Sequence, residues 1–156
     1  MSRKVQLEIL KELLWLGIAV ILCLGVTYPL FGVIDNQHLL LNIGLIVLFV
    51  YYFRFTVFLG DVRIFKNNYI KAGFFALNIG VFLFTLERLQ YFFYVFDNYD
   101  NRYFASGNEI EMSQPQFFSM VEFFKKEIVF FMIGFLILIV FLQFRLLFSK
   151  WKRKKS

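Results

Sequence analysis

Long apolar runs separated by short polar stretches dominate this chain. A helix needs about 20 apolar residues to cross the roughly 30 Å hydrocarbon core of a bilayer. None of the long runs alternates polar and apolar positions as a strand of a membrane barrel does. The pattern predicts an all-α integral membrane protein, a single domain of four transmembrane helices at approximately residues 13–34, 38–59, 72–96 and 128–148.

Composition supports lipid as the surrounding solvent. Hydrophobic residues make up 60% of the 156 residues, with 24 Phe, and charged residues make up 18%. An average soluble domain is about 45–50% apolar and about 25% charged. A soluble domain of this size has only one modest core, which could not enclose so many apolar side chains. We therefore expect much of the surface to face hydrocarbon.

The distribution of Lys and Arg predicts the orientation. They cluster near the N-terminus, around the second connection, and in a basic tail, residues 149–156. The first connection, "DNQH", has none, and the long loop at residues 97–116 is acidic. Because basic connections stay on the cytoplasmic side, we expect both termini in the cytoplasm. We place the protein in a cell membrane, the cytoplasmic (inner) membrane of a bacterium.

An acid and a base interrupt the third apolar run, "VFLFTLERLQYFFYVF". An ionised residue at the centre of a membrane helix costs at least about 2.5–3.5 kcal/mol on insertion scales. Adjacent residues point about 100° apart on a helix, so Glu87 and Arg88 need not pair with each other. They could form an ion or proton site. A structural tie between helices is favoured, because one acid and one base do not make a pathway.

Small residues follow the same helix at four-residue intervals. Ala72, Ala76 and Gly80 form a small-xxx-small series, which lets helix backbones approach closely in lipid. Two of them, Ala76 and Gly80, lie within about 20° of Glu87 around the helix. The face that carries Glu87 is therefore also the face predicted to pack on another helix.

Other polar residues inside the predicted spans are few. Asn42 lies in the outer part of the second span and is expected at the depth of Glu87. Asn78 points about 180° away from Glu87 and needs a different partner. Arg54 can reach the inner headgroups by extending its side chain along the helix.

A helical pattern precedes the fourth span and makes it longer than the membrane requires. "SQPQ" is a helix start, with Ser113 as the cap, and the pattern continues to Phe148. We expect the segment at residues 117–127 to lie on the outer membrane surface or to project as a docking surface. Its apolar side includes Phe117 and Phe118, and its charges nearly cancel between Glu122, Lys125, Lys126 and Glu127.

The sequence shows no recognisable catalytic motif or cluster of catalytic residues. His38 is the only histidine and Cys23 the only cysteine, so neither a histidine pair for haem nor an intrachain disulfide can form. Phosphate-binding, nucleophile-elbow and zinc-protease motifs are absent. We therefore predict no catalytic residue, no metal and no cofactor. A short basic tail carries no sequence readout, and no nucleic-acid partner is expected.

These observations favour a non-catalytic accessory, scaffold or assembly subunit of a larger cytoplasmic-membrane complex. Its expected partners are membrane lipids and either other membrane-protein subunits or further copies of itself. The alternative is a small ion- or proton-coupled channel or transporter that uses Glu87 and Arg88. An enzyme acting on lipids comes third.

Overall fold

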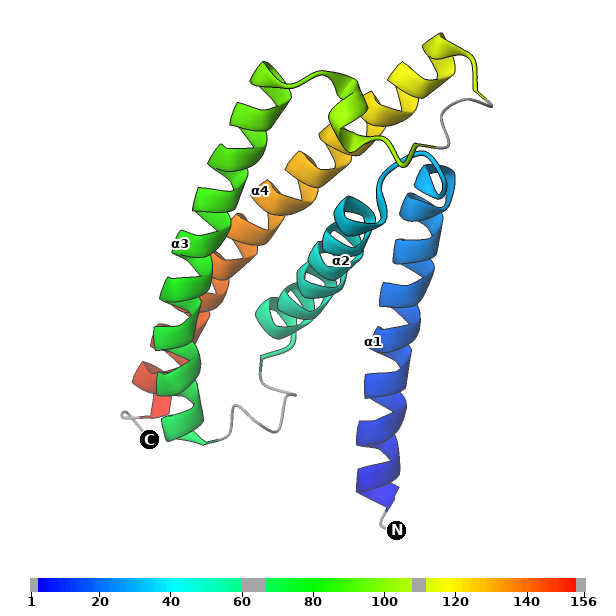
Figure 1. The fold of residues 1–156 in the computed structure, drawn as a ribbon. Coiled ribbons are helices and arrows are strands. Elements are labelled where there is room, and N and C mark those ends of the chain that lie inside the picture. Colours follow the sequence, from blue (N-terminus) through cyan, green and yellow to red (C-terminus); the bar gives the residue numbers. More distant parts are fainter. Residues whose placement is uncertain (1–2, 60–66, 108–111, 154–156) are drawn as a thin grey trace.

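A computed structural model describes residues 3–59, 67–107 and 112–153, with side chains for residues 5–148 within these ranges. Within them the chain is entirely helical apart from connections and one isolated bridge (Figure 1). The elements are α1 (Arg3–Thr27), the short 3-10 helix η1 (Tyr28–Leu30), α2 (Asn36–Val57), α3 (Asn68–Asn98), the short 3-10 helix η3 (Asn101–Phe104) and α4 (Gln114–Arg153).

Four helices are long and apolar enough to cross a membrane, which confirms this part of the prediction. A protein with four such helices suits a multi-pass membrane arrangement. The apolar stretches are longer than predicted in three of the four cases. They run over Val5–Leu30, Asn36–Val57, Asn68–Asn98 and Gln114–Phe148.

The first helix ends earlier than the sequence pattern predicted. α1 stops at Thr27, whereas the predicted span continued to residue 34. Pro29 disfavours the helical conformation in the residue before it, and Gly32 adopts a φ of 79°, which favours glycine. The chain therefore turns at residues 28–34, although these residues are mostly apolar.

The connections α1–α2 and α3–α4 are tied together at one end of the molecule. Ile34 and Ala105 form an antiparallel bridge. The Asp35 amide donates to the Phe104 carbonyl at 2.8 Å, and the Ser106 amide donates to the Val33 carbonyl at 2.9 Å. We call this the connector end. Both termini lie at the opposite, terminal end (Figure 1).

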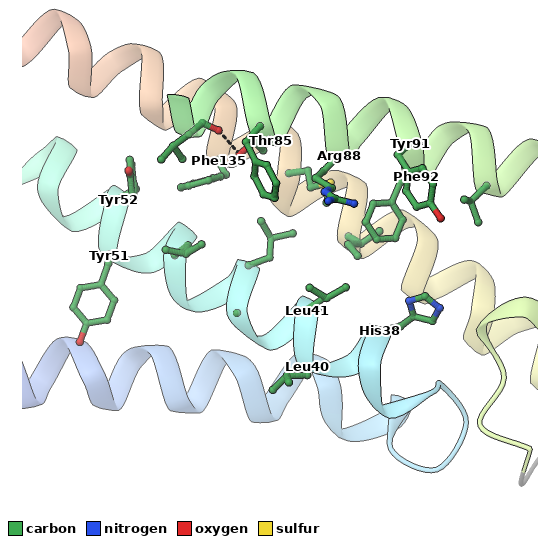
Figure 2. Close-up of a pocket in the computed structure, with 18 of the residues that line it drawn as sticks. His38, Leu40, Leu41, Tyr51, Tyr52, Thr85, Arg88, Tyr91, Phe92 and Phe135 are labelled. Atoms are coloured by element: carbon green, nitrogen blue, oxygen red, sulfur yellow. Dashed lines mark hydrogen bonds between the residues drawn. The ribbon is translucent and has the colours of Figure 1, made fainter. Parts of the chain in front are cut away.

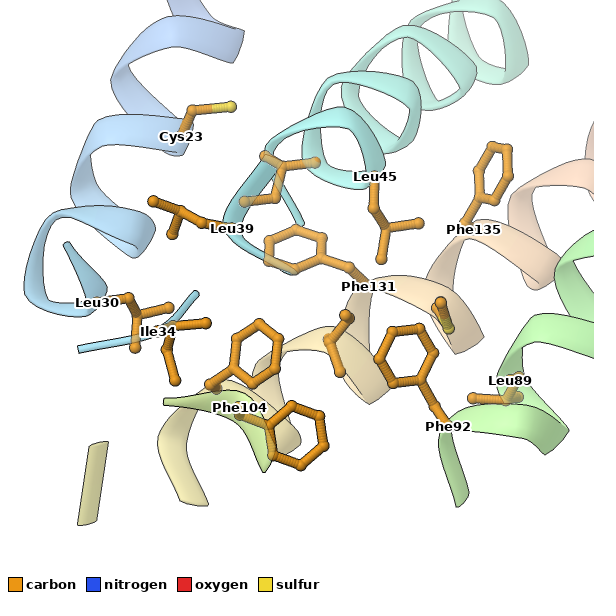
Figure 3. Close-up of a cluster of buried hydrophobic side chains, with 14 of the residues drawn as sticks. Cys23, Leu30, Ile34, Leu39, Leu45, Leu89, Phe92, Phe104, Phe131 and Phe135 are labelled. Atoms are coloured by element: carbon orange, nitrogen blue, oxygen red, sulfur yellow. The ribbon is translucent and has the colours of Figure 1, made fainter. Parts of the chain in front are cut away.

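The fourth helix is the centre of the hydrophobic core. α4 packs against α2 and α3, and α1 packs against α2. Figure 3 shows side chains from all four helices and both connections meeting in one cluster. The buried positions of α4 recur every three or four residues, which is the spacing of one helix face. This face consists of Phe117, Val121, Phe124, Ile128, Phe131, Phe135, Ile139, Leu142 and Leu146, and the adjacent Glu127 and Met132 are also buried.

The first turns of α4 belong to this core and do not form a free surface segment. Phe117 is buried, and Val121 and Phe124 are fully enclosed. Phe104 lies 5.7 Å from Phe124 between ring centroids. Phe117, Val121 and Phe124 therefore pack against the rest of the chain and are not available as a docking surface, whereas Phe118 is exposed. Phe104 of the connector end packs on these turns of α4, a contact that the sequence pattern did not predict.

Several features predicted from charge lie outside the described residues. Of the second connection, Arg63 and Lys66 lie outside them, as do Glu109 and Glu111 of the acidic loop. In the basic tail, residues 149–153 continue α4 and residues 154–156 lie beyond the description.

Candidate functional site

An apolar groove lies between α2 and α3, which both pack on α4 and contact each other where Tyr52 meets Phe74 and Asn78. Its volume is about 980 Å³. Leu41 and Leu45 belong to the α2 wall, Leu77 and Phe84 to the α3 wall, and Met132 of α4 to the floor (Figure 2). Cavities of about 300–1,000 Å³ with apolar walls and a few polar groups are typical binding sites.

The groove contains one charged side chain. Figure 2 shows Arg88 reaching from α3 toward α2. Its guanidinium carbon lies 5.1 Å from the centre of the Phe84 ring, a distance that allows a cation–π contact. None of the lining residues is acidic. In the described part of the chain, Arg88 also forms no ion pair with a carboxylate.

Polar and aromatic side chains close the groove toward the connector end. The His38 ring lies 5.6 Å from the Tyr103 ring and 5.2 Å from the Phe104 ring. A hydrogen bond with Tyr91 is the largest cause that raises the pKa of Tyr103 above its ordinary value. These phenols are neutral hydrogen-bonding groups, so Arg88 remains the only full charge in the groove.

Glu87 lies outside the groove on an exposed face of α3. It does not line the cavity, and within the described residues no hydrogen bond or ion pair reaches it. Glu87 and Arg88 thus serve different sides of α3, as their 100° separation predicted. Among the described residues, none forms with Glu87 the tie between helices that was predicted for it.

The small-residue series shares this uncovered side of α3. Ala72, Ala76 and Gly80 are all exposed. A methyl group added at Gly80 would meet no other atom within 4 Å. No helix of the described chain packs on these residues, so a helix–helix contact there requires another molecule.

Asn42 pairs with an acid, but with Glu127 instead of Glu87. Its side-chain nitrogen donates to a Glu127 carboxylate oxygen at 3.0 Å. Both residues are buried, at 0% and 8% exposure. The side-chain oxygen of Asn42 and the second carboxylate oxygen of Glu127 have no hydrogen-bond partner among the described residues. Glu127 is therefore not a surface residue of this chain, because it lies buried between α2 and α4.

Asn78 has a hydrogen-bond partner other than Glu87, as expected from its position on the opposite side of α3. The Tyr52 hydroxyl donates to its side-chain oxygen at 2.9 Å, inside the protein. The Tyr52 ring lies edge-on to Phe135, with 4.7 Å between centroids. This cluster joins α2, α3 and α4.

The remaining predicted residues of the α4 segment divide between surface and connector contacts. Phe118, Glu122 and Lys126 are exposed, and Lys126 pairs with Glu122 at 2.9 Å. Lys125 donates to the side-chain oxygen of Asn101 at 2.7 Å. The Lys125–Asn101 bond joins α4 to η3, whereas the Lys126–Glu122 pair lies within α4.

Two structural residues were missed in the sequence analysis. Arg54 forms an ion pair with Glu12 of α1, so its side chain does not simply extend to the headgroups. Opposite charges near the same ends of adjacent antiparallel spans were the signal for this pair. Gly134 allows the Phe49 ring to approach, since an added methyl carbon there would lie 2.8 Å from that ring.

The arrangement offers binding surfaces but no visible reaction centre. Among the described residues, no group of three His, Cys, Asp or Glu side chains could hold a metal ion. Comparisons with protein-family models, curated proteins and solved structures found no match to this chain.

Proposed function

We propose that the protein is a non-catalytic accessory or scaffold subunit of a larger complex in the cytoplasmic membrane, with both termini on the cytoplasmic side. The observation that carries the proposal is the position of Glu87, exposed on α3 beside the uncovered small-residue series. Acidic residues inside membranes nearly always face a protein interior or a water-filled cavity. A partner helix on this face would supply that interior.

The small residues make this face suitable for a close helix contact. Helix association in lipid depends on van der Waals packing and on interhelical hydrogen bonds. Ala76 and Gly80 allow a close approach, and Glu87 offers a hydrogen-bonding group about two to three turns along the same helix. The proposed partner face therefore combines the two features that stabilise helix pairs in a membrane.

Purification of the tagged full chain in a gentle detergent, with quantitative mass spectrometry, tests the proposal. We expect a stoichiometric membrane-protein partner, lost when Glu87→Leu or Gly80→Leu alters the face. Gly25→Leu on α1 is the matched control, because Gly25 is also an exposed helical glycine with nothing within 4 Å of an added methyl group. A folded wild-type chain that purifies as a lone monomer would contradict the proposal.

The alternative, an ion- or proton-coupled channel or transporter, has weaker support. Its proposed pair is divided, since Arg88 lines the groove and Glu87 does not. The groove walls are mostly apolar, and such walls do not replace the hydration shell of an ion. Ion flux in reconstituted vesicles that Glu87→Gln and Arg88→Gln both abolish would favour this alternative instead.

A further inference from the structure

We propose that the α2–α3 groove receives a transmembrane helix of the partner subunit, and that this helix carries a carboxylate that pairs with Arg88. The inference rests on the proposed accessory function and assigns it a second contact, distinct from the outer face at Glu87. Three features of the groove support it: its shape, its charge and the depth of that charge.

The shape suits the side of a helix. α2 and α3 form two walls over a floor supplied by α4. A helix with its side chains is about 10–12 Å wide, so only its apolar edge would enter the cavity. Gly44 belongs to the α2 wall, and an added methyl group there would meet nothing within 4 Å. A small residue at such a position lets another backbone approach.

The charge of the groove requires an anion. A guanidinium group in the membrane is a charge that needs a partner. The contact of Arg88 with the Phe84 ring stabilises its charge only in part, and the groove lining provides no carboxylate. Intramembrane Arg residues pair with acids or backbone carbonyls. A carboxylate with two oxygens matches the planar guanidinium better than a single carbonyl does.

The depth of Arg88 favours a helix over a phospholipid headgroup. Arg88 lies five residues beyond Leu83, the middle residue of α3, which is about 7.5 Å along the axis. Headgroups begin about 15 Å from the bilayer centre. The guanidinium also lies over Phe84, one turn closer to the middle of α3. A carboxylate on a helix can lie at this depth, whereas a headgroup phosphate would have to be drawn into hydrocarbon.

Site-specific photo-crosslinking in native membranes tests the assignment. A photoreactive residue replaces Leu41 on one wall or Leu77 on the other, each about half exposed or more and lining the groove. Leu24 on α1, which is 55% exposed, is the control position. We expect both groove positions, but not position 24, to capture one transmembrane peptide that contains Asp or Glu.

Reversing the charge at Arg88 then tests whether capture depends on an ion pair or only on the partner lying nearby. Arg88→Glu should lower capture about tenfold or more, the effect of losing one moderate interaction. Changing the acid of the captured peptide to Lys should restore capture in that background. Leu41→Trp, which fills the groove without changing its charge, should also block docking, and Leu24→Trp should not. Size-exclusion profiles of the purified variants check that each remains folded.

The outcomes separate this inference from the proposed function. Lipid adducts alone at both groove positions would overturn the inference, as would a peptide of a second copy of this chain or capture that is insensitive to Arg88→Glu. If a partner still co-purifies and depends on Glu87, the accessory function survives such a result. If no partner co-purifies at all, both proposals fail.

Discussion

Glu127 and Glu87 have opposite surroundings: Glu127 is enclosed within the protein, and Glu87 is exposed on its surface. Glu127 lies between α2 and α4, almost inaccessible, and accepts a hydrogen bond from Asn42. Glu87 lies on α3, exposed and without a hydrogen bond or ion pair from any described residue. A glutamate thus contributes to internal packing in α4, whereas the glutamate of α3 is exposed.

The glycines of the two helices show the same division. Gly134 of α4 is needed where the Phe49 ring approaches, whereas Gly80 of α3 faces open space. Small residues permit close helix contacts in lipid, but only one of these contacts is made within the chain. The difference shows that α4 is packed at its glycine, whereas the face of α3 around Gly80 is covered by no described helix.

The largest difference between the two sides is expected from matched glycine substitutions. Gly134→Leu should lower the unfolding free energy of the isolated chain by about 1–3 kcal/mol, because extra volume is forced against Phe49. Gly80→Leu should change it by less than about 0.5 kcal/mol. Reversible unfolding in mixed micelles, followed by tryptophan fluorescence, measures both. Equal losses would remove the distinction between the two helices.

The buried pair is tested by a double-mutant cycle. Asn42→Leu should cost about 1–3 kcal/mol, since it leaves the Glu127 carboxyl without its donor. Adding Glu127→Leu should recover most of that loss, because replacing both partners by apolar groups can be nearly neutral. The same unfolding assay applies. Strictly additive effects would show that the two side chains do not interact.

A smaller effect is expected at the contact between α2 and α3. Tyr52→Phe removes the hydroxyl that donates to Asn78. Hydrogen bonds between membrane helices contribute on average about 0.6 kcal/mol and at most about 1.7 kcal/mol. The unfolding free energy should fall within that range. Tyr94→Phe on the exposed side of α3 is the control and should leave stability unchanged; a similar loss there would contradict the assignment.

The smallest effect on stability is expected at Glu87. Glu87→Leu should change the unfolding free energy of the isolated chain by less than about 0.5 kcal/mol, because no described residue bonds to it. The measurement is the same titration in mixed micelles. A loss comparable to that of Asn42→Leu would mean that Glu87 contributes to the fold of the chain itself.

Hydropathy was sufficient to predict four long apolar helices, but it could not say which helix is enclosed. Glu87 and Glu127 were both recognised as acids within or beside apolar segments. Glu87 was expected at a contact between helices and Glu127 on a surface segment, whereas the structure exposes Glu87 and buries Glu127. Burial depends on contacts between distant segments, such as Phe104 of η3 on Phe124 of α4. No local pattern around residues 117–127 encodes that cover.

Directions around a single helix were predicted more reliably than partners between helices. The different sides of α3 occupied by Glu87, Arg88 and Asn78 follow from the helical angle alone, and the structure agrees. The Arg54–Glu12 ion pair depends instead on the depth at which α1 and α2 meet. The chain turn at Pro29 and Gly32 was obscured by the apolar residues around it.

Labelling with a hydrophobic carbodiimide, which reacts with carboxylic acids in apolar surroundings, compares the two glutamates directly in isolated protein and in native membranes. If another subunit completes α3, Glu87 should be modified in the purified chain and protected in native membranes, while Glu127 should be protected in both. Equal modification of Glu87 in the two preparations would show that nothing covers this face in the membrane and would contradict the account.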